Sequence, residues 1–158
     1  MVYILDTNIL RKMLSHLPRR GKLFEEIWAR IERGISEETF ISVDECFNEL
    51  SGQFSKENES MMWLSERKNM FKNPDSAESL IIRDLFMDAK MRESIHIKNL
   101  LDNRPSADVY IAAKAKALQA TVVTAEEYRP HSAQLPNICE KLGVKCISYD
   151  DFMAFVAE

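Results

Sequence analysis

Four acidic residues are the candidates for chemistry in this 158-residue chain, because each belongs to a different predicted element. Asp6 directly follows an apolar predicted strand, and Glu126 follows another strand by two residues. Asp108 lies in the first turn of a predicted helix, on its inward face, and Glu49 lies at the rim of the apolar face of another. Ligands of an open parallel sheet bind beyond the carboxyl ends of its strands, so we expect the four carboxylates to converge there.

Such a convergence of carboxylates has a specific chemical use. Buried carboxylates without a counter-charge repel one another, which costs several kcal/mol or raises their pKa values. A divalent cation removes this repulsion, and oxygen ligands with no His or Cys nearby suit Mg²⁺ or Mn²⁺. The bound ion lowers the pKa of a water molecule and stabilises charge on a reacting phosphate, as in nucleases. The four acids therefore favour metal-dependent hydrolysis of a phosphodiester bond.

Each acid also has a simpler explanation. Asp6 is of a residue type that caps helices, and Asp108 in a first turn complements the helix dipole. Glu49 fits an ordinary solvated helix rim, and Glu126 fits a polar turn. The order and placement of the four residues together, rather than any one of them, favour a shared site.

Charge and glycine spacing exclude several other classes of function. The chain has 21 Lys and Arg against 25 Asp and Glu, a net charge of −4, which excludes a broadly basic nucleic-acid coat and a polybasic membrane anchor. Its four glycines lie far apart, at positions 21, 34, 52 and 143. The Walker A loop and the dinucleotide-binding loop need clustered glycines, so both are excluded.

The chain carries no sign of a membrane or an oxidising compartment. No apolar run approaches 18 residues, and residues 1–6 lack the charged start of a signal peptide. The three cysteines form no C-x-x-C pair, which indicates reduced thiols and a cytoplasmic location. The three histidines are scattered, which argues against a zinc site.

Strands and helices alternate along the chain. The predicted strands are Val2–Leu5, Thr39–Ile41, Thr121–Thr124 and Val144–Ile147. The predicted helices are residues 9–16, 23–33, 43–52, 107–119, 136–142 and 150–157, with two more over residues 58–101 that are separated at Asn73–Pro74. This pattern predicts a three-layer α/β sandwich with a mostly parallel central sheet. We expect one domain over residues 1–158, with a helical insertion in its middle.

Two local patterns refine these boundaries. Gly34 stands where the C-terminal cap of the helix over residues 23–33 is expected. Ser42 is followed three residues later by Glu45, the spacing of a capping box at the start of the next helix.

The order of the four acids resembles that of a PIN domain, the fold of VapC-type toxin ribonucleases. The segments that carry the resemblance are Tyr3–Ile9, Ser42–Leu50, Ala107–Ala115 and Thr121–Glu126. The tail over residues 135–146 resembles one uncharacterised PIN-like subfamily in particular. The resemblance spans nearly the whole chain, although residues 52–104 do not match a general PIN pattern.

The resemblance implies a role for each site residue. Asp6 and Asp108 would be direct ligands of Mg²⁺ (or Mn²⁺), and Glu49 and Glu126 would complete the catalytic acidic cluster. At the last position many PIN domains carry Asp, one methylene shorter than Glu126. The residues that would orient the carboxylates are Asn8 and Thr124.

An RNA substrate needs positive charge near these acids. Without the four site acids, 21 acidic residues face 21 basic ones, so affinity for RNA must come from local patches. The candidates near the exit of the first strand are Arg11, Lys12, Arg19, Arg20 and Lys22. Weaker candidates are Arg104, Lys114 and Lys116, of which the two lysines better fit a solvated helix face.

The resemblance also implies partners. A PIN toxin is silenced by a cognate antitoxin protein and commonly forms a homodimer. Methionine-rich and aromatic helix surfaces suit such docking, and Met61, Met62 and Trp63 form one candidate surface. Three adjacent apolar residues fit a core with one exposed edge better.

Three functions remain open. The first is a metal-dependent endoribonuclease, the toxin of a toxin–antitoxin pair. The second is a non-catalytic PIN-like module that binds a protein or RNA partner. The third is a phosphatase of the haloacid-dehalogenase kind, which needs a second aspartate two residues after the first. Asn8 occupies that position, and an amide cannot act as the general acid.

Overall fold

The central feature of the computed structural model, which describes residues 1–103 and 105–158, is a parallel five-stranded sheet. The strands are β1 (Tyr3–Leu5), β2 (Phe40–Val43), β3 (Phe71–Lys72), β4 (Thr121–Val123) and β5 (Cys146–Ile147). Their order is β3-β2-β1-β4-β5, and every neighbouring pair is parallel. The prediction of a mostly parallel sheet is confirmed, since all five strands run the same way.

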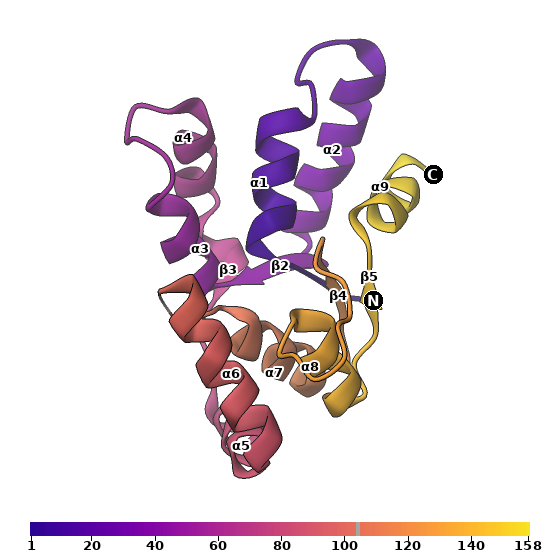
Figure 1. Ribbon diagram of the computed structural model, residues 1–158. Coiled ribbons are helices and arrows are strands. Elements are labelled where there is room, and N and C mark those ends of the chain that lie inside the picture. Colours follow the sequence, from indigo (N-terminus) through magenta and orange to yellow (C-terminus); the bar gives the residue numbers. More distant parts are fainter. Residues whose placement is uncertain (104) are drawn as a thin grey trace.

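Helices cover both faces of this sheet. They are α1 (Thr7–His16), α2 (Lys22–Ser36), α3 (Asp44–Ser51), α4 (Glu59–Glu66), α5 (Ser76–Met87), α6 (Ala89–Asp102), α7 (Asp108–Leu118), α8 (Leu135–Leu142) and α9 (Tyr149–Ala157). In Figure 1, α1, α2 and α9 lie above the sheet, whereas α5, α6, α7 and α8 lie beneath it. The predicted three-layer α/β architecture is confirmed. None of the helices in the described ranges is long and apolar enough to span a membrane.

The central strand β1 explains the arrangement of the layers. Ile4 and Leu5 are completely buried, as expected for a strand that is covered on both faces. Beneath the sheet, α7 contacts β2 and β4 through small side chains such as Ala112 and Ala115, which are also completely buried. Small residues let the helix approach the sheet closely, which brings the first residue of α7 near the end of β1.

The middle of the chain differs from its prediction as two helices. It forms three helices, α4, α5 and α6, together with a 3₁₀ turn over Lys68–Met70 and the strand β3. Phe71 of β3 is buried and pairs with Ser42 of β2, so this region supplies an edge strand of the sheet as well as helices. A strand of two residues is too short to show a period of two in the sequence.

The two boundary predictions at Gly34 and Ser42 are wrong. Helix α2 continues to Ser36, and a Cβ atom at Gly34 would collide with the ring of Phe40. Glycine is therefore required there for close packing and not for a helix cap. Ser42 lies within β2, and its hydroxyl donates a hydrogen bond to the Leu5 carbonyl oxygen at 2.7 Å, which ties β2 to β1.

Candidate metal centre

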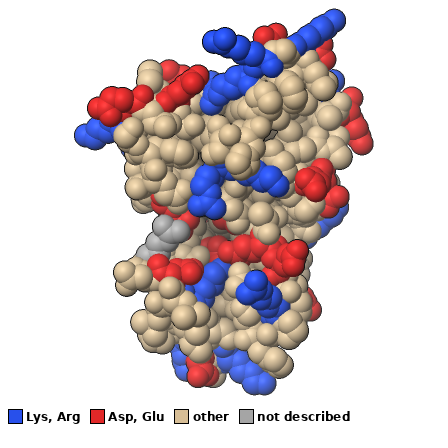
Figure 2. Space-filling view, turned by 45° about the horizontal axis from the view of Figure 1, so that its top comes forward, with Lys and Arg blue, Asp and Glu red and all other residues tan. Residues whose placement is uncertain are grey.

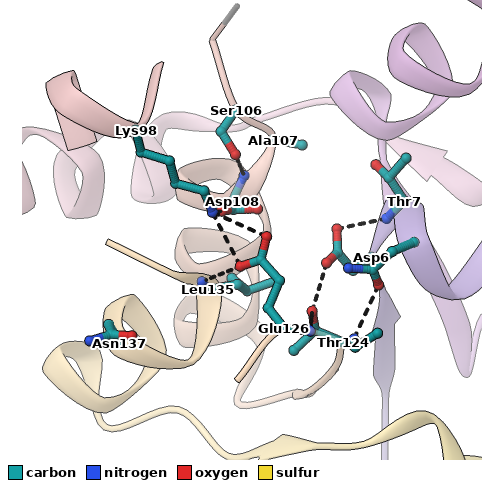
Figure 3. Close-up of polar contacts among 12 residues, drawn as sticks. Asp6, Thr7, Lys98, Ser106, Ala107, Asp108, Thr124, Glu126, Leu135 and Asn137 are labelled. Carbon is teal, nitrogen blue, oxygen red and sulfur yellow. Dashed lines mark hydrogen bonds and ion pairs between the residues drawn. The ribbon is translucent and has the colours of Figure 1, made fainter. Parts of the chain in front are cut away.

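Asp6 lies where β1 ends and α1 begins. One of its carboxylate oxygens accepts a hydrogen bond from the Thr7 backbone N–H at 2.7 Å, so it does cap α1. Its other oxygen accepts a hydrogen bond from the Thr124 hydroxyl at 2.7 Å (Figure 3). With only 4% of its surface exposed, this carboxylate is held rigidly at the carboxyl edge of the sheet.

Two further carboxylates meet Asp6 at this edge. Asp108 is the first residue of α7, and Glu126 lies in the loop that follows β4. One carboxylate oxygen from each of the three residues lies within 4.8 Å of the other two. Glu126 is fixed there by the backbone N–H of Leu135, which donates to its Oε2 at 2.7 Å (Figure 3). Three of the four predicted acids are therefore brought together, from three separate elements.

Glu49, the fourth predicted acid, lies outside this cluster of three. Its Oε2 accepts a hydrogen bond from the Thr7 hydroxyl at 2.6 Å, and its Oε1 accepts one from the Ala107 backbone N–H at 3.1 Å. Glu49 thus joins α3 to the starts of α1 and α7. It contributes to the site by fixing the helix start that carries Asp108.

The two predicted orienting residues act differently from each other. The Thr124 hydroxyl contacts Asp6 directly and accepts a hydrogen bond from the Glu126 backbone N–H at 3.1 Å. The Asn8 Oδ1 instead accepts a hydrogen bond from the Ala125 backbone N–H at 3.1 Å. Asn8 therefore fixes the loop that carries Glu126. This hydrogen bond is made to the backbone of that loop and not to a carboxylate of the cluster.

Lys98 is a site residue that no sequence signal indicated. It extends from α6 so that its ammonium group pairs with Asp108 and lies 3.1 Å from both carboxylate oxygens of Glu126 (Figure 3). Its side chain is only 13% exposed. The contact depends on how α6 folds back against α7, which no local pattern reports.

The pKa values of this cluster reflect an excess of negative charge. Burial raises the pKa of Asp6 to about 8, and the nearby charge of Asp108 adds to the increase. Burial also raises the pKa of Asp108 to about 6, with a further contribution from Glu126. Burial by itself lowers the pKa of Lys98, but the two carboxylates it contacts outweigh this effect and raise it above its usual value. The cluster favours binding of further positive charge.

The cluster opens into a small hollow of about 140 Å³. Acidic side chains gather in a hollow across the middle of the face in Figure 2, with basic side chains on either side of it. Arg11 lines the hollow beside the acids and donates a hydrogen bond to Gln53 at 3.3 Å. Lys12 lies over the ring of Tyr149, 4.2 Å from its centroid.

The remaining predicted RNA-binding residues lie farther away. Arg19, Arg20 and Lys22 are located in or beside the loop between α1 and α2, at the opposite end of α1 from Asp6. A ten-residue helix is about 15 Å long. Arg19 stacks on Trp28, 4.7 Å from the ring centroid. The structure therefore divides the predicted basic patch into a part near the acids and a part remote from them.

The structure also locates Lys114 and Lys116, two of the weaker candidates for RNA binding. Lys114 was expected on a solvated helix face, but it is only 5% exposed and pairs with Glu78 of α5. That expectation is wrong, because α5 packs against this face of α7. Lys116 is exposed as expected, and Arg104 lies outside the described residues.

The predicted docking residues range from buried to exposed, and the cysteines form no disulfide among the described residues. Trp63 is buried, Met61 is half-buried and Met62 is 54% exposed, which is a core with one exposed edge. The three cysteines, Cys46, Cys139 and Cys146, are free thiols.

Comparison with protein families assigns the chain to a family. The family described as "Domain of unknown function (DUF4411)" matches residues 3–156. The chain belongs to this DUF4411 family. The DUF4411 chain is also similar to the crystal structure of VapBC2 from Rickettsia felis bound to a DNA fragment from their promoter, with 15% sequence identity and a TM-score of 0.53. This similarity covers 94% of the DUF4411 chain and 98% of that chain. No curated protein matches.

The fold of the DUF4411 chain is therefore VapC-like, in agreement with the PIN-like resemblance of its sequence. Its acidic cluster is compatible with a divalent metal ion, because Asp6, Asp108 and Glu126 offer oxygen ligands within reach of one position.

Proposed function

We propose that this protein is a metal-dependent endoribonuclease that hydrolyses phosphodiester bonds of RNA. The observation that carries the proposal is the meeting of Asp6, Asp108 and Glu126 within 4.8 Å at the carboxyl edge of the sheet. The raised pKa of Asp6 supports it, because a cation bound there would relieve the repulsion that raises it.

Asp6 and Asp108 would hold Mg²⁺ or Mn²⁺, and Glu126 would complete the acidic cluster. When bound, the ion supplies a water of lowered pKa and stabilises negative charge on the phosphate. The residues of the chain provide the positioning. Thr7 and Thr124 fix the carboxylate of Asp6, and Glu49 fixes the start of α7 through Ala107.

The small volume of the hollow supports an extended RNA backbone as the substrate. Pockets for drug-sized ligands usually measure about 300–1,000 Å³, so the hollow of about 140 Å³ suits a phosphate group better than a nucleotide base. Arg11, which lines the hollow, would contact an adjacent phosphate, and Lys12 follows it on α1. The bases would then remain outside the hollow.

For the biological role, we propose a toxin of a toxin–antitoxin pair that acts in the cytoplasm as one domain over residues 1–158. The VapC-like fold supports this role, as does its likeness to VapBC2. The cognate antitoxin would be a protein partner, and two copies of the chain would form a homodimer. We place the chain in an uncharacterised PIN-like subfamily on the basis of the sequence of its tail.

The test is cleavage of a panel of structured and unstructured RNAs by the purified full-length chain, with Mg²⁺, with Mn²⁺ and with a chelator. The variant Asp6→Asn, Asp108→Asn runs beside the wild type, and Asp84→Asn, an exposed acid on α5, is the matched control. We expect metal-dependent cleavage that the double variant loses and the control retains. Cleavage that survives in the double variant would contradict the proposal.

A non-catalytic module that binds RNA or a protein is the second candidate. The specific observation in its favour is the ammonium of Lys98, which already pairs with Asp108 and Glu126 as in a structural ion-pair network. Stable RNA binding without turnover at any concentration of Mn²⁺ would favour this module. The phosphatase alternative has no support, since the side chain of Asn8 holds the Ala125 backbone.

A further inference from the structure

Lys98 is the one positive charge in contact with the acidic cluster among the residues that the structure describes. It comes from α6, outside the segments that resemble PIN motifs. An ammonium group is a compact charge with three N–H donors. In this structure those donors serve Asp108 and the two carboxylate oxygens of Glu126.

The positive charge is distributed unevenly over the cluster. Asp108 and Glu126 share the ammonium of Lys98, whereas Asp6 accepts hydrogen bonds from two neutral groups, the Thr7 N–H and the Thr124 hydroxyl. Within the described residues, no ion pair reaches Asp6. The charge that remains to be neutralised therefore lies on the side of Asp6.

We infer that Lys98 takes the place of a second metal ion, so that the centre binds a single divalent ion between Asp6 and Asp108. The inference rests on the proposed metal-dependent function and sets the number of ions. Lys98 is a positioning residue in this account. It keeps Asp108 and Glu126 close together without occupying the Asp6 side.

The formal charges of the cluster agree with the binding of one divalent ion. Three ionised carboxylates and one ammonium leave two negative charges, which one divalent ion neutralises. A second divalent ion would leave two positive charges on these four groups, of which Asp6 and Asp108 are buried. Glu49, Asp102 and Arg11 also line the hollow and together add one negative charge. Burial of uncompensated charge is unfavourable, and a second ion would compete with Lys98 for the carboxylates of Asp108 and Glu126.

The experiment counts Mn²⁺ ions bound to the full-length, metal-free chain by isothermal titration calorimetry, with electron paramagnetic resonance of free Mn²⁺ as an independent measure. We expect one ion for the wild type and one for Lys98→Arg, which keeps the charge. We expect two ions for Lys98→Gln, because the Asp108–Glu126 side is then left without a cation. The matched control is Lys90→Gln on the same helix, an exposed residue, for which we expect one ion.

The other possible ion counts contradict either the role of Lys98 or the metal-dependent function. Two ions on the wild type, or one ion on folded Lys98→Gln, would overturn the role of Lys98 and leave the nuclease proposal standing. No ion on the folded wild type would instead contradict the metal-dependent function itself. If circular dichroism shows that Lys98→Gln does not fold, Lys98→Met replaces it, and the count on the wild type decides by itself between one ion and two.

Discussion

Two buried clusters of charge lie along α7, and each contains a lysine. Near the start of the helix, Lys98 meets Asp108 and Glu126, with Asp6 close by. Six residues along the same helix, Lys114 pairs with a single acid of α5. The two clusters share a helix and residue types, and they differ in the balance of charge and in access to solvent.

The second cluster is a closed ion pair, and the Glu45 carboxylate interacts with both of its charges from farther away. The side chains of Lys114 and Glu78 are only 7% and 2% exposed, and Lys114 also donates to the Asn73 carbonyl at 3.1 Å. The ammonium thus donates to one carboxylate and one carbonyl oxygen, in a contact that holds α5 against α7. The first cluster has one ammonium for three carboxylates and opens into a hollow. Charge balance and access to solvent together distinguish this structural ion pair from the candidate metal site.

The largest expected effect comes from breaking the balanced pair. The variant Glu78→Gln leaves the ammonium of Lys114 buried without a counter-charge, so we expect a loss of about 3–5 kcal/mol in the free energy of unfolding. Urea denaturation measures this loss. The double variant Glu78→Leu, Lys114→Met should recover much of it, and Lys116→Met on the exposed part of α7 should change stability by less than about 0.5 kcal/mol. A larger loss in the double variant than in Glu78→Gln would contradict the structural role.

Removal of an acidic charge from the cluster of Asp6, Asp108 and Glu126 should affect RNA cleavage and leave the stability of the fold unharmed. The variant Glu126→Gln removes one of three mutually repelling charges, so the free energy of unfolding should stay constant or increase. RNA cleavage should fall at least about a hundredfold, equivalent to about 2.7 kcal/mol. The adjacent exposed residue supplies the control, since Glu127→Gln should leave both quantities unchanged. A destabilised Glu126→Gln with normal cleavage would remove the distinction between the clusters.

The pH dependence of stability sharpens the comparison further. The pKa of Asp6 rises from 3.8 to about 8 on folding, so between these values the folded state keeps a proton that the unfolded state has lost. Stability then decreases as pH rises, by at most about 1.4 kcal/mol per pH unit for one proton. From pH 6 to pH 7 we expect a loss of about 1 kcal/mol in metal-free protein.

Chemical denaturation at each pH measures this effect. The variant Asp6→Asn should show a shallower decrease than the wild type, and saturating Mn²⁺ should flatten the wild-type decrease. An equally steep decrease in Asp6→Asn would show that another group is responsible.

The smallest expected effect concerns Glu49. The variant Glu49→Gln keeps an acceptor for the Ala107 N–H but weakens the hydrogen bond from Thr7. We expect a loss of about 1 kcal/mol in the free energy of unfolding, while binding of Mn²⁺ persists. Calorimetry with Mn²⁺ checks the second part, and loss of all binding would place Glu49 among the metal ligands.

The strand ends made three of the acids predictable. Asp6 and Glu126 follow predicted strands, and Asp108 begins a helix with an apolar inward face. Because the carboxyl ends of parallel strands share one edge, their convergence follows from the order of strands and helices. Glu49 lines the same hollow as these three acids, while its two oxygens accept hydrogen bonds from the Thr7 hydroxyl and the Ala107 N–H.

The two lysines could not be placed from the sequence, for different reasons. Lys98 belongs to α6, whose apolar residues form no clear stripe, and its contact depends on a tertiary arrangement. Lys114 lies on a helix that is covered by the sheet on one side and by α5 and α8 on others, so no solvated face exists at its position. Likewise β3 escaped detection because its two residues show no periodicity.

The most direct test of the account is a crystal structure of the full chain with Mn²⁺, in which anomalous scattering locates the ions. We predict one anomalous peak, in direct contact with carboxylate oxygens of Asp6 and Asp108, with Lys98 still paired to Glu126 and with no peak at Glu78. A peak at Glu78, or no peak at Asp6 in crystals whose Mn²⁺ concentration saturates the protein in solution, would contradict the account.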